Sequence, residues 1–135
     1  MQFDPYEVKD AVKLTSIDDL EADEVFIKAS KLALDVQGLF SFVAECPRWR
    51  DLYDQIQRSS ASVLANFSEG WGKIRGHCSS AWLIARGECS ETLANLTIAP
   101  KNFRDLKPQC KEVYKLLDAK ILGLVERHER PAWKN

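Results

Sequence analysis

The sequence predicts an all-α chain folded as an up-down-up-down antiparallel four-helix bundle. Four segments repeat apolar residues at intervals of three and four, which is the period of one helix face. No segment shows the alternation of a β-strand, and the connections between the four segments are short. Helices of this size are about 30–35 Å long, which suits one bundle.

The composition is that of one ordinary globular domain. Of the 135 residues, 45% are hydrophobic and 29% are charged. No apolar run approaches the roughly 20 residues needed to cross a bilayer, and no secretion signal is visible at the N-terminus. We therefore expect a cytoplasmic protein without a membrane partner. The expected parts are an acidic N-terminal extension over residues 1–23, a bundle domain over 24–130 and a C-terminal tail over 131–135.

The first long helix is expected over about residues 25–45. Residues 15–19 supply capping residues and acidic side chains, which are typical of a helix start. Pro47 disfavours helical backbone at Cys46, so the helix should end near Glu45. The inward positions are Val25, Ala29, Leu32, Val36, Leu39 and Val43.

The second helix runs from about Asp51 to the glycines at 70–72, and it contains the most unusual stretch of the chain. Between Val63, Phe67 and Trp71, residues 59–72 carry mostly Ser, Ala and Gly. Small residues between large ones allow a neighbouring helix to approach closely. This helix is therefore expected to be surrounded by protein.

The third and fourth helices complete the bundle. The third is expected to begin between His77 and Ser80 and to end near Ala99, because Pro100 follows. Residues 102–108 have the composition of a turn connection. The fourth helix, from about Cys110 to Pro131, has the clearest amphipathic pattern of the chain. The inward positions of the second, third and fourth helices are, in order, Leu52, Ile56, Val63 and Phe67; Trp82, Ala85, Cys89, Leu93 and Leu96; and Cys110, Val113, Tyr114, Leu117, Ile121, Leu124, Val125 and His128.

Four motifs between Cys46 and Leu93 resemble those of one bacterial family. They are Cys46-Pro47; Asp51-Leu52-Tyr53; the spaced set Gln55, Arg58, Ser62, Asn66, Glu69, Gly70 and Gly72; and Ile84, Ala85, Gly87, Glu91 and Leu93. The pattern is similar to that of the four-helix-bundle family encoded in intervening sequences of 23S ribosomal RNA genes, over roughly residues 24–126. Leu64 replaces the family's proline, and residues 57–60 lack part of its basic run.

The resemblance implies assembly and partners as well as fold. Members of the family form homopentameric rings with a central channel. A related branch, the accessory variability determinant of diversity-generating retroelements, binds nucleic acid and its reverse transcriptase. A homo-oligomer, a pentamer by resemblance, and RNA or DNA together with a reverse transcriptase are thus the expected partners.

Basic residues near the turn between the second and third helices are candidates for nucleic-acid binding. These residues are Lys73, Arg75, His77 and Arg86. In a ring, symmetry would repeat them into a continuous basic rim. An ordinary solvated face is the alternative, because residues 25–135 hold 17 basic and 12 acidic residues, a net charge of only +5.

Residues 1–24 hold eight acidic residues and two lysines, a net charge of −6, and could cover a basic surface or simply aid solubility.

A second candidate set is polar and lies on the second helix. Asn66 and Glu69 are three residues apart and share a helix face, with Arg58 further along it. We interpret Arg58, Asn66 and Glu69 as a structural network that keeps helices or subunits in register. No nucleophile has a nearby base with an orienting group, and no phosphate-binding loop is visible. The sequence therefore predicts a protein that is not an enzyme and has no catalytic residues or cofactor.

The four cysteines, at positions 46, 78, 89 and 110, do not form a paired metal-binding motif. Their spacing does not match that of zinc ligands, so we expect no metal site. In a reducing compartment they are expected to behave as small buried hydrophobic residues.

Two classes of function remain open. The first is a non-catalytic, ring-forming protein that binds nucleic acid or assists a reverse transcriptase. The second is an oligomeric scaffold that binds another protein through the acidic residues 1–24 or through Trp133 in the tail. Salt-sensitive binding to RNA or DNA would distinguish the first from the second.

Overall fold

The computed structural model describes residues 16–72 and 78–129, with the side chains of 78–79 and 124–129 excepted. All regular elements in these ranges are helical, so the predicted all-α class is confirmed. The long helices are α3 (Glu24–Gln37), α5 (Arg50–Trp71), α6 (Cys78–Thr97) and α8 (Lys107–Glu129). The short ones are α2 (Ile17–Ala22), α4 (Phe40–Glu45), α7 (Lys101–Arg104) and the 3₁₀ turn η1 (Pro47–Trp49).

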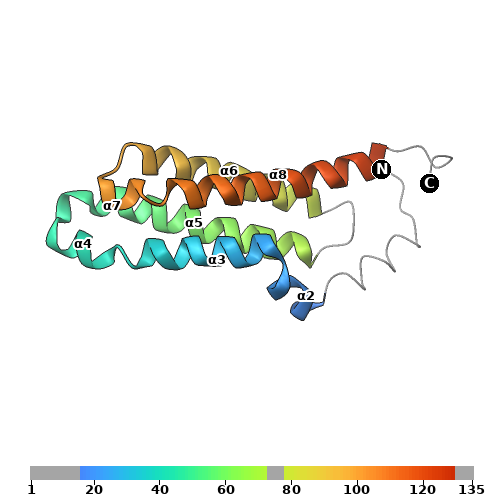
Figure 1. The fold of residues 1–135 in the computed structure, drawn as a ribbon, viewed down its shortest axis with the longest axis horizontal. Helices are drawn as coiled ribbons and strands as arrows, with labels where there is room; N and C mark the ends of the chain where they lie inside the picture. The colour runs from blue at the N-terminus through green and yellow to red at the C-terminus, as the bar shows by residue number, and fades with distance from the viewer. Residues whose placement is uncertain (1–15, 73–77, 130–135) are drawn as a thin grey trace.

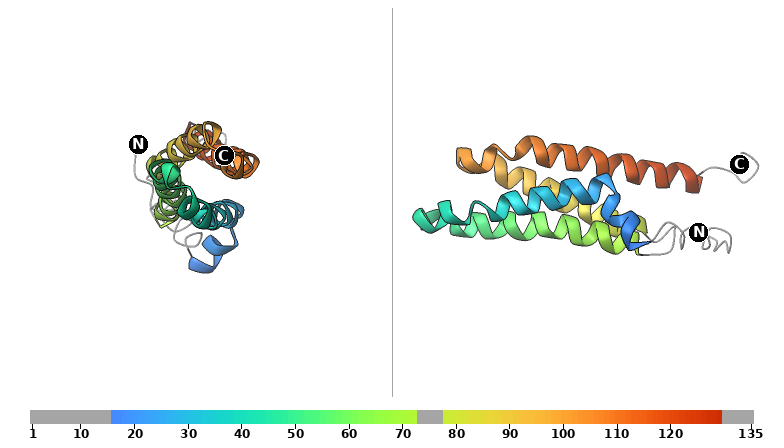
Figure 2. Two further views of the ribbon diagram at one scale, coloured as in Figure 1. Left: turned by 90° about the vertical axis from the view of Figure 1, so that its left-hand side faces the viewer. Right: turned by 60° about the horizontal axis from the view of Figure 1, so that its bottom comes forward.

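The four long helices lie lengthwise along the molecule (Figure 1). Helices α3 and α6 run in one direction, and α5 and α8 run in the other. Helix α5 packs against α3 and α6, and α8 packs against α6 and α3, with the most extensive contact between α5 and α6. The right-hand view of Figure 2 shows the same lengthwise arrangement, and the left-hand view looks along the helices from one end. Within the described ranges no helix combines the length and the apolar character that a membrane span requires.

The core contains the apolar residues that the helical period placed inward. Those predicted and found buried include Val25, Ala29, Leu32, Val36, Val43, Ile56, Val63, Phe67, Ala85, Cys89, Leu96, Cys110, Val113, Leu117 and Ile121. Trp82 joins this core, with its ring stacked on Phe67 at 5.2 Å between centroids and its indole Nε1 donating to the Phe67 carbonyl oxygen at 3.0 Å. Each fully buried large apolar side chain of the core, such as a valine, leucine or phenylalanine, contributes about 1.5–3 kcal/mol to folding.

The first predicted helix is divided into two, which corrects the expectation of one helix to Glu45. Helix α3 ends at Gln37, and α4 begins at Phe40 after a turn at Gly38 and Leu39. The Gly38 N–H still donates to the Leu34 carbonyl oxygen at 3.1 Å, so the chain leaves the helix only after this residue. Glycine disfavours a helix interior by about 1 kcal/mol relative to alanine, which makes this the weakest point of the segment.

The connection after α6 is also more ordered than expected. Residues 101–104, which overlap the predicted turn connection, form α7, and the buried Phe103 lies in it. The Phe103 ring is edge-on to Phe42 at 5.9 Å and to Tyr53 at 6.4 Å. These aromatic contacts close one end of the helix assembly, and they join residues too distant in sequence for a local pattern to reveal.

Asp23 connects three parts of the chain at the opposite end. It lies between α2 and α3, where its Oδ1 accepts a hydrogen bond from the Val25 N–H at 2.8 Å and so caps α3. Its Oδ2 accepts from Lys120 Nζ of α8. The same ammonium group lies 5.4 Å from the centroid of the Trp71 ring at the end of α5. One side chain thus caps α3 and links it to α8.

Replacing Asp23 with alanine should lower the free energy of unfolding by about 1–2 kcal/mol, because the cap of α3 and the ion pair with Lys120 are both lost. Asp23→Asn keeps a capping oxygen and removes the charge, so its loss should be smaller. Urea denaturation of both variants measures the difference. Equal losses in the two variants would show that the cap contributes nothing.

Candidate functional site

The structure places one of the four predicted nucleic-acid contacts, Arg86. Lys73, Arg75 and His77 lie outside the described residues. Arg86, on α6, is half-buried, and its Nη1 donates to Asp118 Oδ1 of α8 at 2.6 Å. Its charge is therefore balanced by a carboxylate and helps to hold α6 against α8. Sequence reasoning missed this partner because the two residues are 32 positions apart.

The predicted polar network of Arg58, Asn66 and Glu69 lies on α5, but Asn66 makes its hydrogen bonds within that helix. Its Nδ2 donates to the carbonyl oxygen and to the Oγ of Ser62, both at 2.9 Å. Glu69 is exposed near the end of α5. Burial raises the pKa of Glu88 on α6, and the exposed Arg58 is close enough for its charge to offset part of this rise. A role for these residues in register stays a prediction.

A different polar contact joins the two helices inside the core. The hydroxyl groups of Ser59 on α5 and Thr92 on α6 are 2.6 Å apart, and both residues are buried. The Thr92 hydroxyl also bonds the Glu88 carbonyl oxygen at 2.9 Å. Buried hydroxyl groups that are fully hydrogen-bonded fix how two helices meet. The serines of residues 59–72 predicted close helix packing, but the sequence did not indicate that Thr92 is the partner of Ser59.

Glu88 is the carboxyl group of α6 with a resolved pKa shift. Burial raises its pKa, and the neighbouring charge of Glu91 raises it further, while the charge of Arg58 acts in the opposite direction. Glu88 and Glu91 are three residues apart, so both carboxyl groups lie on one side of α6. At neutral pH this side therefore holds two like charges opposed by one cation of α5.

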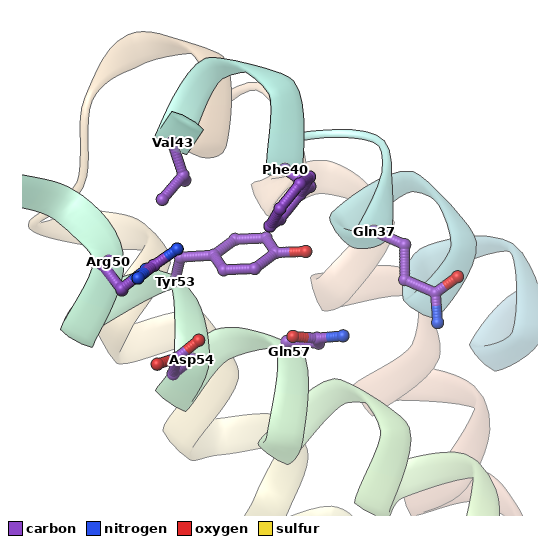
Figure 3. Close-up of a pocket in the computed structure, with 7 residues that line it drawn as sticks. All are labelled: Gln37, Phe40, Val43, Arg50, Tyr53, Asp54 and Gln57. Atoms are coloured by element: carbon purple, nitrogen blue, oxygen red, sulfur yellow. The ribbon is translucent and has the colours of Figure 1, made fainter. Parts of the chain in front are cut away.

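An open hollow of about 500 Å³ lies where α3, α4 and α5 meet (Figure 3). In this view the Tyr53 ring lies between Phe40 and Gln57, and its hydroxyl points toward the side on which Gln37 lies. The other lining residues are Val43, Asp54 and Gln57. Burial raises the pKa of Tyr53, and the Asp54 charge adds to this effect, so the phenol stays protonated at neutral pH.

This hollow has the chemistry of a binding surface. It combines aromatic walls with amide groups and one charge of each sign, and its lining contains no serine, cysteine or histidine that could act as a nucleophile with a base. Sequence reasoning missed it because it lies at the break between α3 and α4, which the sequence analysis did not predict. A glycine within a helical pattern was the only local signal.

Helix α6 is apolar on both sides. Its inward side chains, including Ala81, Trp82, Ala85 and Cys89, are buried, whereas Leu83 and Ile84 are 46% and 53% exposed. Small residues continue this outer face toward the C-terminal end of the helix; they are Gly87, Ser90 and Ala94. Among the described side chains of α6, Glu91 is the exposed charge, because Arg86 and Glu88 are partly buried.

Among the side chains that the structure describes, no group of three or more His, Cys, Asp or Glu residues could hold a metal ion. In the comparisons with known proteins, a family model described as 23S rRNA-intervening sequence protein matches residues 21–119. Neither the search of curated proteins nor that of solved structures returned a match.

Replacing Glu88 with glutamine should stabilise the fold at neutral pH by roughly 0.2–0.5 kcal/mol, because one of two like charges is removed. A raised pKa means that the folded chain binds this proton more tightly than the unfolded chain. Wild-type stability should therefore fall as the pH rises from below 4.5, the ordinary pKa, through the raised value. The gain from Glu88→Gln should vanish at acid pH, where the carboxyl is protonated in both states.

Thermal unfolding of wild type and variant between acid and neutral pH tests this expectation. Arg58→Gln is the matched control, because it removes the attractive charge and should destabilise the chain at neutral pH. A gain from Glu88→Gln that persists at acid pH would exclude charge repulsion as its cause.

Proposed function

The chain belongs to the 23S rRNA-intervening sequence protein family, and we propose that it is a non-catalytic protein whose copies assemble into a ring that binds nucleic acid. The observation that carries this proposal is the apolar outer face of α6, which follows the basic residues of segment 73–77 in the sequence. A ring of copies that meet through α6 would repeat these basic residues once per subunit. By resemblance, the ring is a pentamer and an accessory to a reverse transcriptase.

The subunit of this ring is an up-down-up-down antiparallel four-helix bundle. The opposed directions of consecutive long helices support this topology (Figure 1). Contacts of α3 with α5, of α5 with α6, of α6 with α8 and of α8 with α3 support closure of the four helices around one core. In such a bundle α6 keeps one side free for another subunit.

The outer face of α6 is suited to self-association because it is apolar and nearly free of charge. Leu83 and Ile84 are large, and Gly87 has open space at the position of a β-carbon. A contact across a small residue allows helices of two copies to approach closely. Depletion of charge together with exposed aliphatic side chains is also typical of the centre of a protein interface.

We assign nucleic-acid binding to Lys73, Arg75 and His77, between α5 and α6 in the sequence. Arg86 stays a candidate contact, although Asp118 balances its charge. A net charge of +5 over residues 25–135 is modest for one chain, but ring symmetry multiplies each local excess of charge. Binding through phosphate contacts should therefore depend strongly on both assembly and salt.

A protein-binding scaffold is the second candidate function. The observation that favours it is the hollow formed by α3, α4 and α5, where Arg50 and Asp54 flank an aromatic wall. Such a surface could hold a segment of a protein partner, in addition to the acidic residues 1–24 and Trp133. Self-association is common to both candidates, whereas binding to RNA or DNA belongs to the first alone.

Replacing Leu83 and Ile84 with glutamine should dissociate the assembly. Losing two apolar side chains from each contact should raise the dissociation constant at least tenfold, since each buried aliphatic group contributes about 1.5–3 kcal/mol. Light scattering at micromolar concentration measures the mass. Ile27→Gln, at an exposed position of α3, is the matched control and should leave the mass unchanged. A wild-type chain that is monomeric at micromolar concentration would contradict self-association.

Reversing the charges of Lys73 and Arg75 to glutamate should abolish salt-sensitive binding to RNA or DNA, because phosphate contacts become repulsions. Fluorescence anisotropy with labelled RNA and DNA across a salt series measures this loss. Lys111→Glu with Lys115→Glu, at exposed positions of α8, makes the same change in charge away from the turn and should weaken binding much less. If wild type does not bind at low salt, with or without residues 1–24, the scaffold remains as the function.

A further inference from the structure

Two buried cysteine side chains face each other between α6 and α8. The Sγ atoms of Cys89 and Cys110 are 3.7 Å apart, and neither residue is exposed to solvent. Each sulfur also lies 3.4 Å from the main-chain carbonyl oxygen of the other cysteine. Each cysteine side chain therefore reaches the main chain of the opposite helix.

This reciprocal arrangement makes a covalent bond between the sulfurs feasible. A disulfide has a sulfur–sulfur distance of about 2.05 Å and joins residues whose Cα atoms are roughly 4.4–6.8 Å apart. Because each sulfur already reaches the main chain of the opposite helix, rotation of the two side chains can bring the sulfurs together. The helices need little movement.

We propose that Cys89 and Cys110 form a reversible intramolecular disulfide when the protein meets a peroxide. One thiolate attacks an oxygen of hydrogen peroxide, which gives a sulfenic acid and hydroxide. The second thiol then attacks the sulfenic sulfur, and the oxygen leaves as water. In total two thiols and one hydrogen peroxide give one disulfide and two water molecules, so the sulfurs supply the two electrons that the peroxide takes up.

The two thiols influence each other: the contact between them lowers the pKa of Cys110 and, together with burial, raises that of Cys89. The geometry is reciprocal and either sulfur can donate in this contact, so whichever thiol reacts first with peroxide has the other in place to resolve the sulfenic acid. Burial of both residues favours a small oxidant over a bulky disulfide such as oxidised glutathione.

The bond would fasten α6 to α8. It would close a loop of 21 residues that includes α7, and it would add a covalent link to the ion pair of Arg86 with Asp118. Closing such a loop reduces the freedom of the unfolded chain, which stabilises the fold. Oxidation should therefore act as a reversible lock on the position of α6.

The experiment uses the full chain with Cys46→Ser and Cys78→Ser, so that the proposed pair is the only source of thiols. After treatment with hydrogen peroxide, intact mass should fall by two hydrogen atoms, and peptides containing positions 89 and 110 should be linked. The midpoint of thermal unfolding should rise by about 5 °C. Dithiothreitol should reverse both changes.

Cys89→Ser in the same background is the control, and it should show neither the loss of mass nor the rise in melting temperature. Its Cys110 should instead gain oxygen. In the decisive measurement, the chain with Cys46→Ser and Cys78→Ser is treated with peroxide while folded and is then unfolded and labelled with a thiol reagent. The proposal is wrong if both remaining thiols still react with the reagent. It is equally wrong if the cysteines link two chains, if they are oxidised separately, or if the linked protein melts no higher than the reduced one.

Discussion

Close packing of α5 against α6 is the contact on which the rest of the structure depends. Small and hydroxyl-bearing residues allow it: Ser59, Ser60 and Gly70 of α5 are buried, as are Ala81 and Ala85 of α6. The Ser59–Thr92 hydrogen bond and the Phe67–Trp82 stack then fix the relative position of the two helices. Because these groups lie in a low-dielectric interior, each is costly to leave unpaired and therefore specifies one arrangement.

Helices α3 and α8 complete the core with contacts of another kind. Lys28 of α3 is 3.4 Å from Glu112 of α8, and Asp23 bonds Lys120 where α3 begins. The Lys28–Glu112 pair is half-exposed, so it orients the helices more than it stabilises them. The apolar interior thus supplies most of the stability, while these two ion pairs help to orient α3 against α8.

Much of the fold could be predicted from the sequence, because helical period is a local property. Most of the predicted inward positions from Val25 to Ile121 are buried, whereas Leu39, Leu52, Leu93 and Tyr114 are partly buried. The ends of α5 and α6 lie within a few residues of those expected. The break at Gly38 was missed because the apolar period continues across it to Val43. One glycine was outweighed in the pattern by the six apolar positions around it.

The candidate sites could be predicted less well, since they depend on which residues meet across helices. No local pattern pairs Arg86 with Asp118 or forms the hollow around Tyr53. The outer face of α6 was also hidden, because apolar residues on both sides of a helix remove the contrast on which periodicity depends. The family motifs were more informative than periodicity here, because most of them lie in α5 and α6, the two helices that pack most closely.

The contact between α3 and α8 has a consequence for how the chain folds. The contacts of α3 with α5, of α5 with α6 and of α6 with α8 join long helices that follow one another, whereas α3 and α8 come from opposite ends of the sequence. Consecutive helices can pair early, since closing short loops has a small entropic cost. The Asp23–Lys120 contact spans 97 residues and should form last. During synthesis, the surface of α3 that packs against α8 would therefore stay exposed to solvent until α8 has left the ribosome.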